Sequence, residues 1–85
     1  MNYIVYWIVV ALDDLAAVWM AAVDRNAVTA AAHQLEQEIA ADPYGRGLFR
    51  ASSGNYTAVD LPLGIEFDIV EDDKTVRILR VWSLV

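Results

Sequence analysis

Residues 61–82 read LPLGIEFDIVEDDKTVRILRVW, and this stretch predicts one tight β-hairpin. Residues 64–70 alternate between apolar and other side chains, a period of two that is typical of a strand with one buried face. The turn spans residues 71–74 and centres between Asp72 and Asp73. The cross-strand pairs expected from this register are Ile69 with Val76, Phe67 with Ile78, and Asp68 with Arg77. A slip of one residue would break all three pairs.

Two helices are expected upstream of the hairpin. Asp13 and Asp14 are expected to open the first, because acidic side chains there satisfy free backbone N–H groups and complement the helix dipole. Asn26 is expected to cap the second helix, which ends at Pro43. The apolar stripe of the first helix is Leu12, Leu15, Ala16, Trp19, Ala22 and Val23. The apolar face of the second is Val28, Ala31, Ala32, Leu35 and Ile39.

The remaining segments predict further strands. Residues 3–10 are apolar on both sides, which suits a strand buried on both faces or an edge strand covered by a partner. Residues 48–52 can form a short irregular strand, and residues 56–61 form another. The order is β-α-α-β-β-β. It predicts a single α+β domain over residues 1–85, with a helical hairpin packed on one face of a mostly antiparallel, four-stranded sheet.

Composition limits the classes of function. The net charge of −6 opposes direct nucleic-acid binding, since phosphate contacts need clustered Lys and Arg. Without cysteine the chain has neither disulfides nor a thiolate metal site, and no cofactor or metal is expected. The uncharged start lacks the basic residues of a signal peptide and is too short to span a bilayer, so we expect a cytoplasmic protein without membrane contact. The hydrophobic content of 58% is high for so small a domain and favours a partner chain.

Three segments carry a resemblance to a known family. They are LDDLAAVWMAAVDR, VTAAAHQLEQEIAADPYGRG and LPLGIEFDIVEDDKTVRILRVW. Together they resemble the helices and the strand–Pro-Leu–strand ending of the RelE/ParE superfamily of toxins from bacterial type II toxin–antitoxin modules, which include plasmid stabilisation systems. The resemblance implies an antitoxin partner. It also implies one of two activities: RelE-like toxins cleave messenger RNA on the ribosome, whereas ParE-like toxins inhibit DNA gyrase.

The chain departs from that family in three respects. Toxins of the superfamily are usually basic, and this chain is acidic. RelE-like members continue into a basic tail with a tyrosine, whereas this sequence ends VRILRVWSLV. Many members have a basic residue where Tyr56 stands. The candidate catalytic residues are therefore Arg50, Arg77, Arg80 and Tyr56, with Tyr44 as a further possible acid or base.

Other candidate residues have structural explanations. Arg77 is expected to face Asp68, which would cancel its field. The single histidine, His33, is expected to be solvated on the second helix, and Trp19 to lie in the core. Trp7 and Trp82 are candidate partner-binding residues, because aromatic anchors on outer strands suit an interface, with core packing as the alternative. Leu84 is a third candidate, because it adds apolar surface that so small a domain would struggle to cover.

Three hypotheses of function follow. The leading one is a toxin-like protein that acts by protein–protein binding and is neutralised by an antitoxin, contacting DNA only through it. Its target would be gyrase or another protein, or the chain would be a catalytically degenerate member. The first alternative is a ribosome-dependent mRNA endonuclease with the three arginines as phosphate clamps. The second is a homodimeric α+β domain with no toxin role. The nuclease requires the arginines and Tyr56 on one face free of carboxylates, whereas interleaved Asp60, Glu66 and Asp68 would oppose it.

Overall fold

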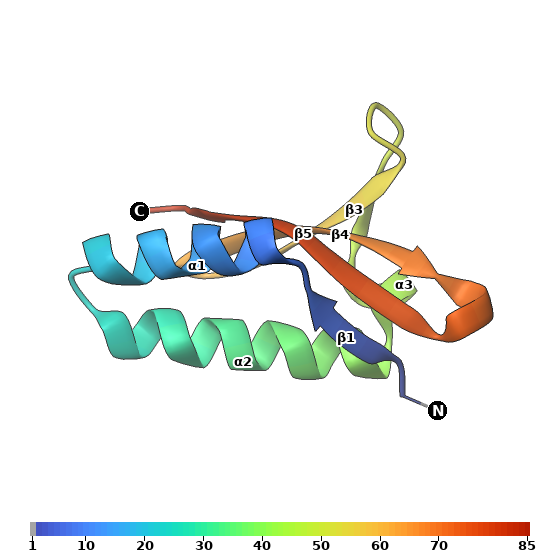
Figure 1. Cartoon of the computed structure of the whole chain (residues 1–85), viewed down its shortest axis with the longest axis horizontal. Helices are drawn as coiled ribbons and strands as arrows, with labels where there is room; N and C mark the ends of the chain where they lie inside the picture. Colours follow the sequence, from blue (N-terminus) through green and yellow to red (C-terminus); the bar gives the residue numbers. More distant parts are fainter. Residues whose placement is uncertain (1) are drawn as a thin grey trace.

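The computed structural model describes residues 2–85, which form a layer of helices packed on a twisted sheet (Figure 1). The elements in chain order are β1 (Ile4–Trp7), α1 (Val9–Ala21), α2 (Arg25–Ala41), α3 (Pro43–Arg46), β2 (Leu48–Arg50), β3 (Asn55–Asp60), β4 (Leu63–Val70), a 3₁₀ turn (Glu71–Asp73) and β5 (Thr75–Ser83). The predicted α+β class and the helical hairpin on the sheet are confirmed.

The sheet has five strands in the order β1-β5-β4-β3-β2. The four strands predicted are one too few, because β2 pairs with β3 and extends the sheet by an edge strand. All pairs are antiparallel except β1 with β5, which are parallel. β1 therefore forms the other edge of the sheet, and it spans only Ile4–Trp7 of the predicted residues 3–10 because α1 begins at Val9. The edge position agrees with one of the two expectations, and burial on both faces is wrong. Ile4 is 69% exposed there.

The register of the β4–β5 hairpin is the predicted one. Ile69 faces Val76, Phe67 faces Ile78 and Asp68 faces Arg77. A β-bulge then interrupts the ladder, since Glu66 pairs with Arg80 and leaves Leu79 as the extra residue. Strict alternation from Ile78 would turn Arg80 into the core. The bulge turns Val81 inward instead and leaves Arg80 exposed.

Helix α2 buries the face that its periodicity predicts. Val28, Ala31, Leu35 and Ile39 are buried, and Ala32 is partly exposed. The cap, however, is Asp24 rather than Asn26: the Asp24 carboxylate accepts a hydrogen bond from the backbone N–H of Ala27 at 3.1 Å. Both residues are good capping types, so the sequence alone did not distinguish them.

Helix α1 differs most from its prediction. It begins at Val9, directly after β1, with Ile8 at its N-cap and no side-chain cap, so the expected opening at Asp13 and Asp14 is wrong. The face turned to the core carries Ala11, Leu15, Val18 and Ala22. Of the predicted stripe, the exposed members are Leu12, Ala16, Trp19 and Val23. The helix is apolar around most of its circumference, so periodicity could not identify the buried face.

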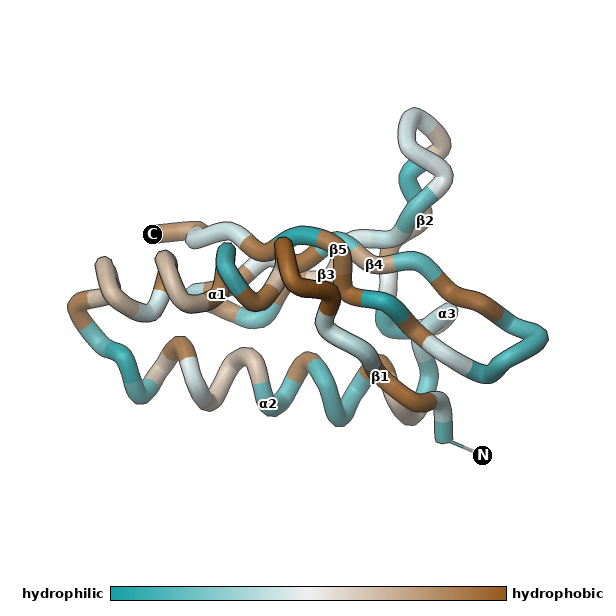
Figure 2. The backbone as a smooth tube through the Cα atoms, in the orientation of Figure 1, coloured by the Kyte–Doolittle hydropathy of each residue, from teal (hydrophilic) through white to brown (hydrophobic). Residues whose placement is uncertain are grey.

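The core lies between the helices and the sheet. Its largest fully buried side chains include Phe67, Leu35, Ile39, Leu63 and Ile65. Hydrophobic residues also mark β1 and the start of α1 (Figure 2). Among residues 2–85, none of the helices has the length and hydrophobicity that a membrane crossing requires.

Candidate functional site

The candidate arginines lie on the face of the sheet opposite the helices. Strand alternation places Arg77 and Arg80 there from β5, and Arg50 from β2. Two carboxylates of β4, Glu66 and Asp68, project from the same face between them. The structure therefore brings the three arginines to one surface and sets acidic groups among them.

Arg77 is held by the carboxylate directly across the ladder. Its Nε lies 2.9 Å from Oδ1 of Asp68, and its Nη2 donates a second bond to Oδ2. Hydrogen bonding to Asp68 raises the pKa of Arg77 above its ordinary value. A bidentate guanidinium–carboxylate pair leaves little net charge for a substrate phosphate.

Arg80 is bound by Asp14, a residue that was expected to open the first helix. Its Nε lies 2.8 Å from Oδ2 of Asp14, and its Nη2 lies 3.3 Å from Oδ1. Asp14 also accepts the backbone N–H of Val81 at 3.0 Å, so its carboxylate ties α1 to β5. The hydrogen bonds from Arg80 and Val81 lower the pKa of Asp14, and those to Asp14 raise the pKa of Arg80.

Asp14 should make folding stability depend on pH. Because its pKa is lowered in the folded state, its contribution is complete above the unfolded value of about 3.9 and is lost as the pH falls through the folded value. We expect Asp14→Asn to be less stable than the parent at neutral pH, with the gap closing below about pH 4. Urea unfolding at a series of pH values measures this. A difference in unfolding free energy between the two proteins that stays constant with pH would contradict a lowered pKa for Asp14. The pKa of Glu38 is also lowered, by its hydrogen bond with Arg46. Because Glu38 is present in both proteins, its contribution cancels in the comparison.

Unlike Arg77 and Arg80, the candidate catalytic residues Arg50 and Tyr56 are not paired with a carboxylate in the described part of the chain. None of the ion pairs among residues 2–85 involves Arg50, whose Nε donates to Oγ1 of Thr57 at 3.2 Å. Tyr56 lies on the helix-facing side of the sheet, where its ring stacks on Phe67 with centroids 5.6 Å apart. The structure therefore separates Tyr56 from the arginines. Glu66 lies among them and accepts from Nδ2 of Asn55 at 3.1 Å.

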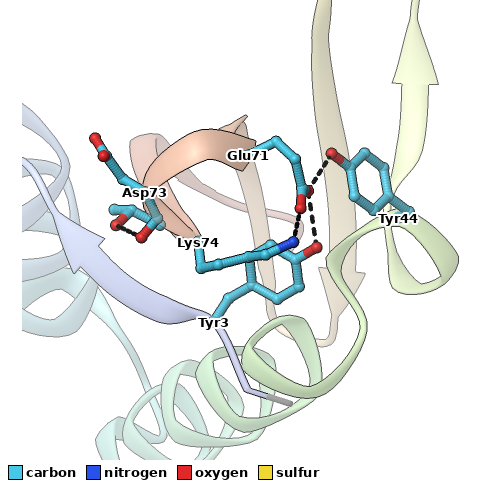
Figure 3. Close-up of polar contacts among 6 residues, drawn as sticks. Tyr3, Tyr44, Glu71, Asp73 and Lys74 are labelled. Carbon is cyan, nitrogen blue, oxygen red and sulfur yellow. Dashed lines mark hydrogen bonds and ion pairs between the residues drawn. The ribbon is translucent and has the colours of Figure 1, made fainter.

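Tyr44 belongs to a polar cluster at the tip of the β4–β5 hairpin (Figure 3). Its hydroxyl donates to Oε1 of Glu71 at 2.7 Å, and the Tyr3 hydroxyl donates to the same oxygen at 2.8 Å. Lys74 pairs with the other carboxylate oxygen. Burial, with the neighbouring Tyr3 and Tyr56, raises the pKa of Tyr44, which opposes its use as a base near neutral pH.

The three candidate partner-binding residues do not form one patch. Trp7 points to the helix side and donates from its indole Nε1 to Glu36 at 2.5 Å. Trp82 lies on the opposite face of the sheet, with its indole over Gly64. Leu84 is exposed beyond β5, and its backbone N–H donates to the carbonyl of Pro62 at 2.9 Å. His33 is exposed on α2, and no three metal-ligating side chains converge within residues 2–85.

Sequence reasoning missed an exposed apolar surface, which lies on the outer side of α1 and the turn that follows it. We call it the α1 surface. Its exposed large side chains are Val9, Val10, Leu12, Trp19, Met20 and Val23. Trp19, expected in the core, is 39% exposed, and the guanidinium of Arg25 lies 4.6 Å from its ring centroid. The sequence feature that could have indicated this surface is the scarcity of polar residues on every side of the helix.

Two grooves border the α1 surface. One, of about 390 Å³, runs between the helices and is lined by Leu12, Leu15, Ala16, Trp19, Val28, Thr29 and Ala32. The other, of about 610 Å³, lies between the turn of the helical hairpin and the segment around Pro62, where Val85 also lines it. Both are lined mainly by apolar side chains, which suits contact with apolar side chains of another protein.

Comparison with known proteins identifies the fold. No family model matches the chain, and no curated protein matches it. Two solved structures are similar over 98% of this chain. One is from the toxin–antitoxin complex RelBE2 of Mycobacterium tuberculosis, with a TM-score of 0.79, 22% identity and 99% of that chain covered. The other is a mutant of the E. coli toxin RelE in the free state, with a TM-score of 0.71, 13% identity and 84% of that chain covered.

Proposed function

From its RelE-type fold and the α1 surface, we propose that this chain is the toxin-like component of a bacterial type II toxin–antitoxin module and acts by binding other proteins. The observation that carries the proposal is the exposed apolar side of α1. The charged residues of this helix are Asp13 and Asp14, and Asp14 is already bound to Arg80. A helix that is hydrophobic nearly all round is normally covered, and here much of it faces solvent.

The first partner in this proposal is an antitoxin. The M. tuberculosis neighbour was solved in a toxin–antitoxin complex, and the two apolar grooves suit the apolar face of a partner helix. The exposed edge strand β1 offers a second contact, by strand addition beside Tyr6, which is 56% exposed. Ser83 and Val85 line the larger groove, and the exposed Leu84 stands between them in the chain.

A ribosome-dependent mRNA endonuclease is the second candidate function. It is favoured by the placement of Arg50, Arg77 and Arg80 on one sheet face of a RelE-type fold. The pairing of Arg77 with Asp68 and of Arg80 with Asp14 weighs against it, because a phosphate clamp needs uncompensated charge. A homodimer through the α1 surface is the third candidate.

Inducible expression in a bacterium, with growth and mRNA integrity followed together, tests these functions. We expect growth arrest with intact mRNA, rescued by co-expression of the proposed antitoxin. A triple variant, Arg50→Gln, Arg77→Gln and Arg80→Gln, should arrest growth as the parent does, since glutamine keeps hydrogen-bonding capacity without charge. Cleaved mRNA that becomes intact in this variant would support the nuclease instead. Unimpaired growth without antitoxin binding would contradict the toxin-like role.

A further inference from the structure

Four aromatic rings form a continuous row that starts on the helix-facing side of the sheet and passes over α3. They run from Phe49 on β2 through Tyr56 on β3 and Tyr44 on α3 to Tyr3 beside β1. Their successive ring centroids are 5.3, 6.0 and 6.4 Å apart, and each pair meets edge to face. Phe49 is 54% exposed and Tyr44 is 48% exposed. This aromatic row is separate from the α1 surface and from the arginines.

The aromatic row ends at an acidic turn. Both Tyr3 and Tyr44 donate to Glu71, and the neighbouring Asp72 and Asp73 are exposed (Figure 3). No ion pair among residues 2–85 uses either aspartate. The ammonium of Lys74 lies 5.4 Å from the centroid of the Tyr3 ring and pairs with Glu71. Lys74, a cation of the chain itself, therefore already contacts both an aromatic ring and a carboxylate of this surface.

We propose that the aromatic row is a docking site for an extended, arginine- or lysine-bearing segment of a partner protein. Cations stack favourably on exposed aromatic rings, and the acidic turn supplies complementary charge at one end of the row. The net charge of −6 and the two aspartates of the turn oppose nucleic acid as the occupant.

A second copy of the chain is a poor occupant, because its own cations are engaged. Four of the six pair with carboxylates: Arg46, Lys74, Arg77 and Arg80. Arg25 donates to the carbonyls of Trp19 and Met20 and stacks on the Trp19 ring. Arg50, the sixth, donates to Thr57 on the other face of the sheet. A partner of different sequence is therefore the better source of the cations.

A titration of the ¹⁵N-labelled chain, followed by NMR, tests the proposal with synthetic peptides. The probe is acetyl-(Gly-Arg)₃-amide and its matched control is acetyl-(Gly-Glu)₃-amide. We expect the arginine peptide alone to shift backbone amides of residues 44–50 and 71–75. Phe49→Leu, which keeps the apolar bulk but removes the ring, should weaken binding by about 2- to 5-fold. Phe49→Trp should tighten it, since Trp is the best cation–π acceptor.

Two further variants complete the test. Trp19→Leu removes an aromatic ring from the α1 surface and should leave the Kd unchanged. Asp72→Asn with Asp73→Asn, in an exposed turn where the fold is little affected, should weaken binding and flatten its dependence on salt. Equal shifts with the glutamate peptide, shifts confined to other residues, or a Kd indifferent to the Phe49 and aspartate variants would overturn the proposal. None of these measurements involves the antitoxin, so the proposed function can fail independently.

Discussion

Phe67→Ala is expected to lower the free energy of unfolding by about 3–5 kcal/mol, because it truncates the largest fully buried side chain of the core. Phe67 lies in the middle of β4, pairs with Ile78 across the ladder and stacks against Tyr56. Its ring also lies so close to Gly47 that a side chain at that glycine would collide with it. Alanine would leave a cavity at the junction of the sheet, α3 and the loop around Gly47. Urea denaturation followed by circular dichroism measures the loss.

Phe49→Ala is the matched control for Phe67. It removes the same side chain from the same aromatic cluster, but at an exposed position on the edge strand β2. We expect a loss of less than about 1 kcal/mol, because little apolar area returns to water. Similar losses in the two variants would show that the core does not centre on β4.

Leu12→Glu combined with Trp19→Glu is expected to weaken antitoxin binding by at least about 100-fold, while the chain remains folded. Both side chains are exposed on the α1 surface and line the groove between the helices. Glutamates there would have to be buried unpaired beneath a partner helix, which costs several kcal/mol. Calorimetry with the proposed antitoxin gives the Kd, and circular dichroism reports folding.

The control for these glutamates adds the same charge elsewhere. Ala30 and Gln37 are exposed on α2 and line neither apolar groove, so Ala30→Glu with Gln37→Glu should leave the Kd within about 2-fold. Loss of binding in both double variants would point to general charge repulsion. Retained binding in the α1 variant would show that the antitoxin docks on another surface.

The parts of the fold that were predictable depend on neighbours in sequence. The β4–β5 register follows from a short turn and strict alternation, so Asp68 could be placed opposite Arg77 without a structure. The buried face of α2 was equally clear, because Glu, Gln and His occupy its other side. The α+β class followed from the order of these elements.

The candidate site was less predictable, since its partners lie far apart in the chain. Asp14 and Arg80 are 66 residues apart, and no local pattern links them. A single bulge at Leu79 decides that Arg80 lies on the outer face. The aromatic row likewise joins Tyr3, Tyr44 and Phe49 from three different parts of the fold. For α1, the uniform apolarity that makes its outer side a candidate interface also concealed which side is buried.

Local patterning thus specified the helical hairpin, the register of the last two strands and the excess of apolar side chains, because each depends on periodicity or composition. The packing of distant segments specified the remainder: the neutralised arginines, the exposed side of α1 and the ring cluster at the acidic turn. Those features occur where the sequence pattern does not distinguish one face of an element from the other. Contacts between distant segments then determine which face is buried.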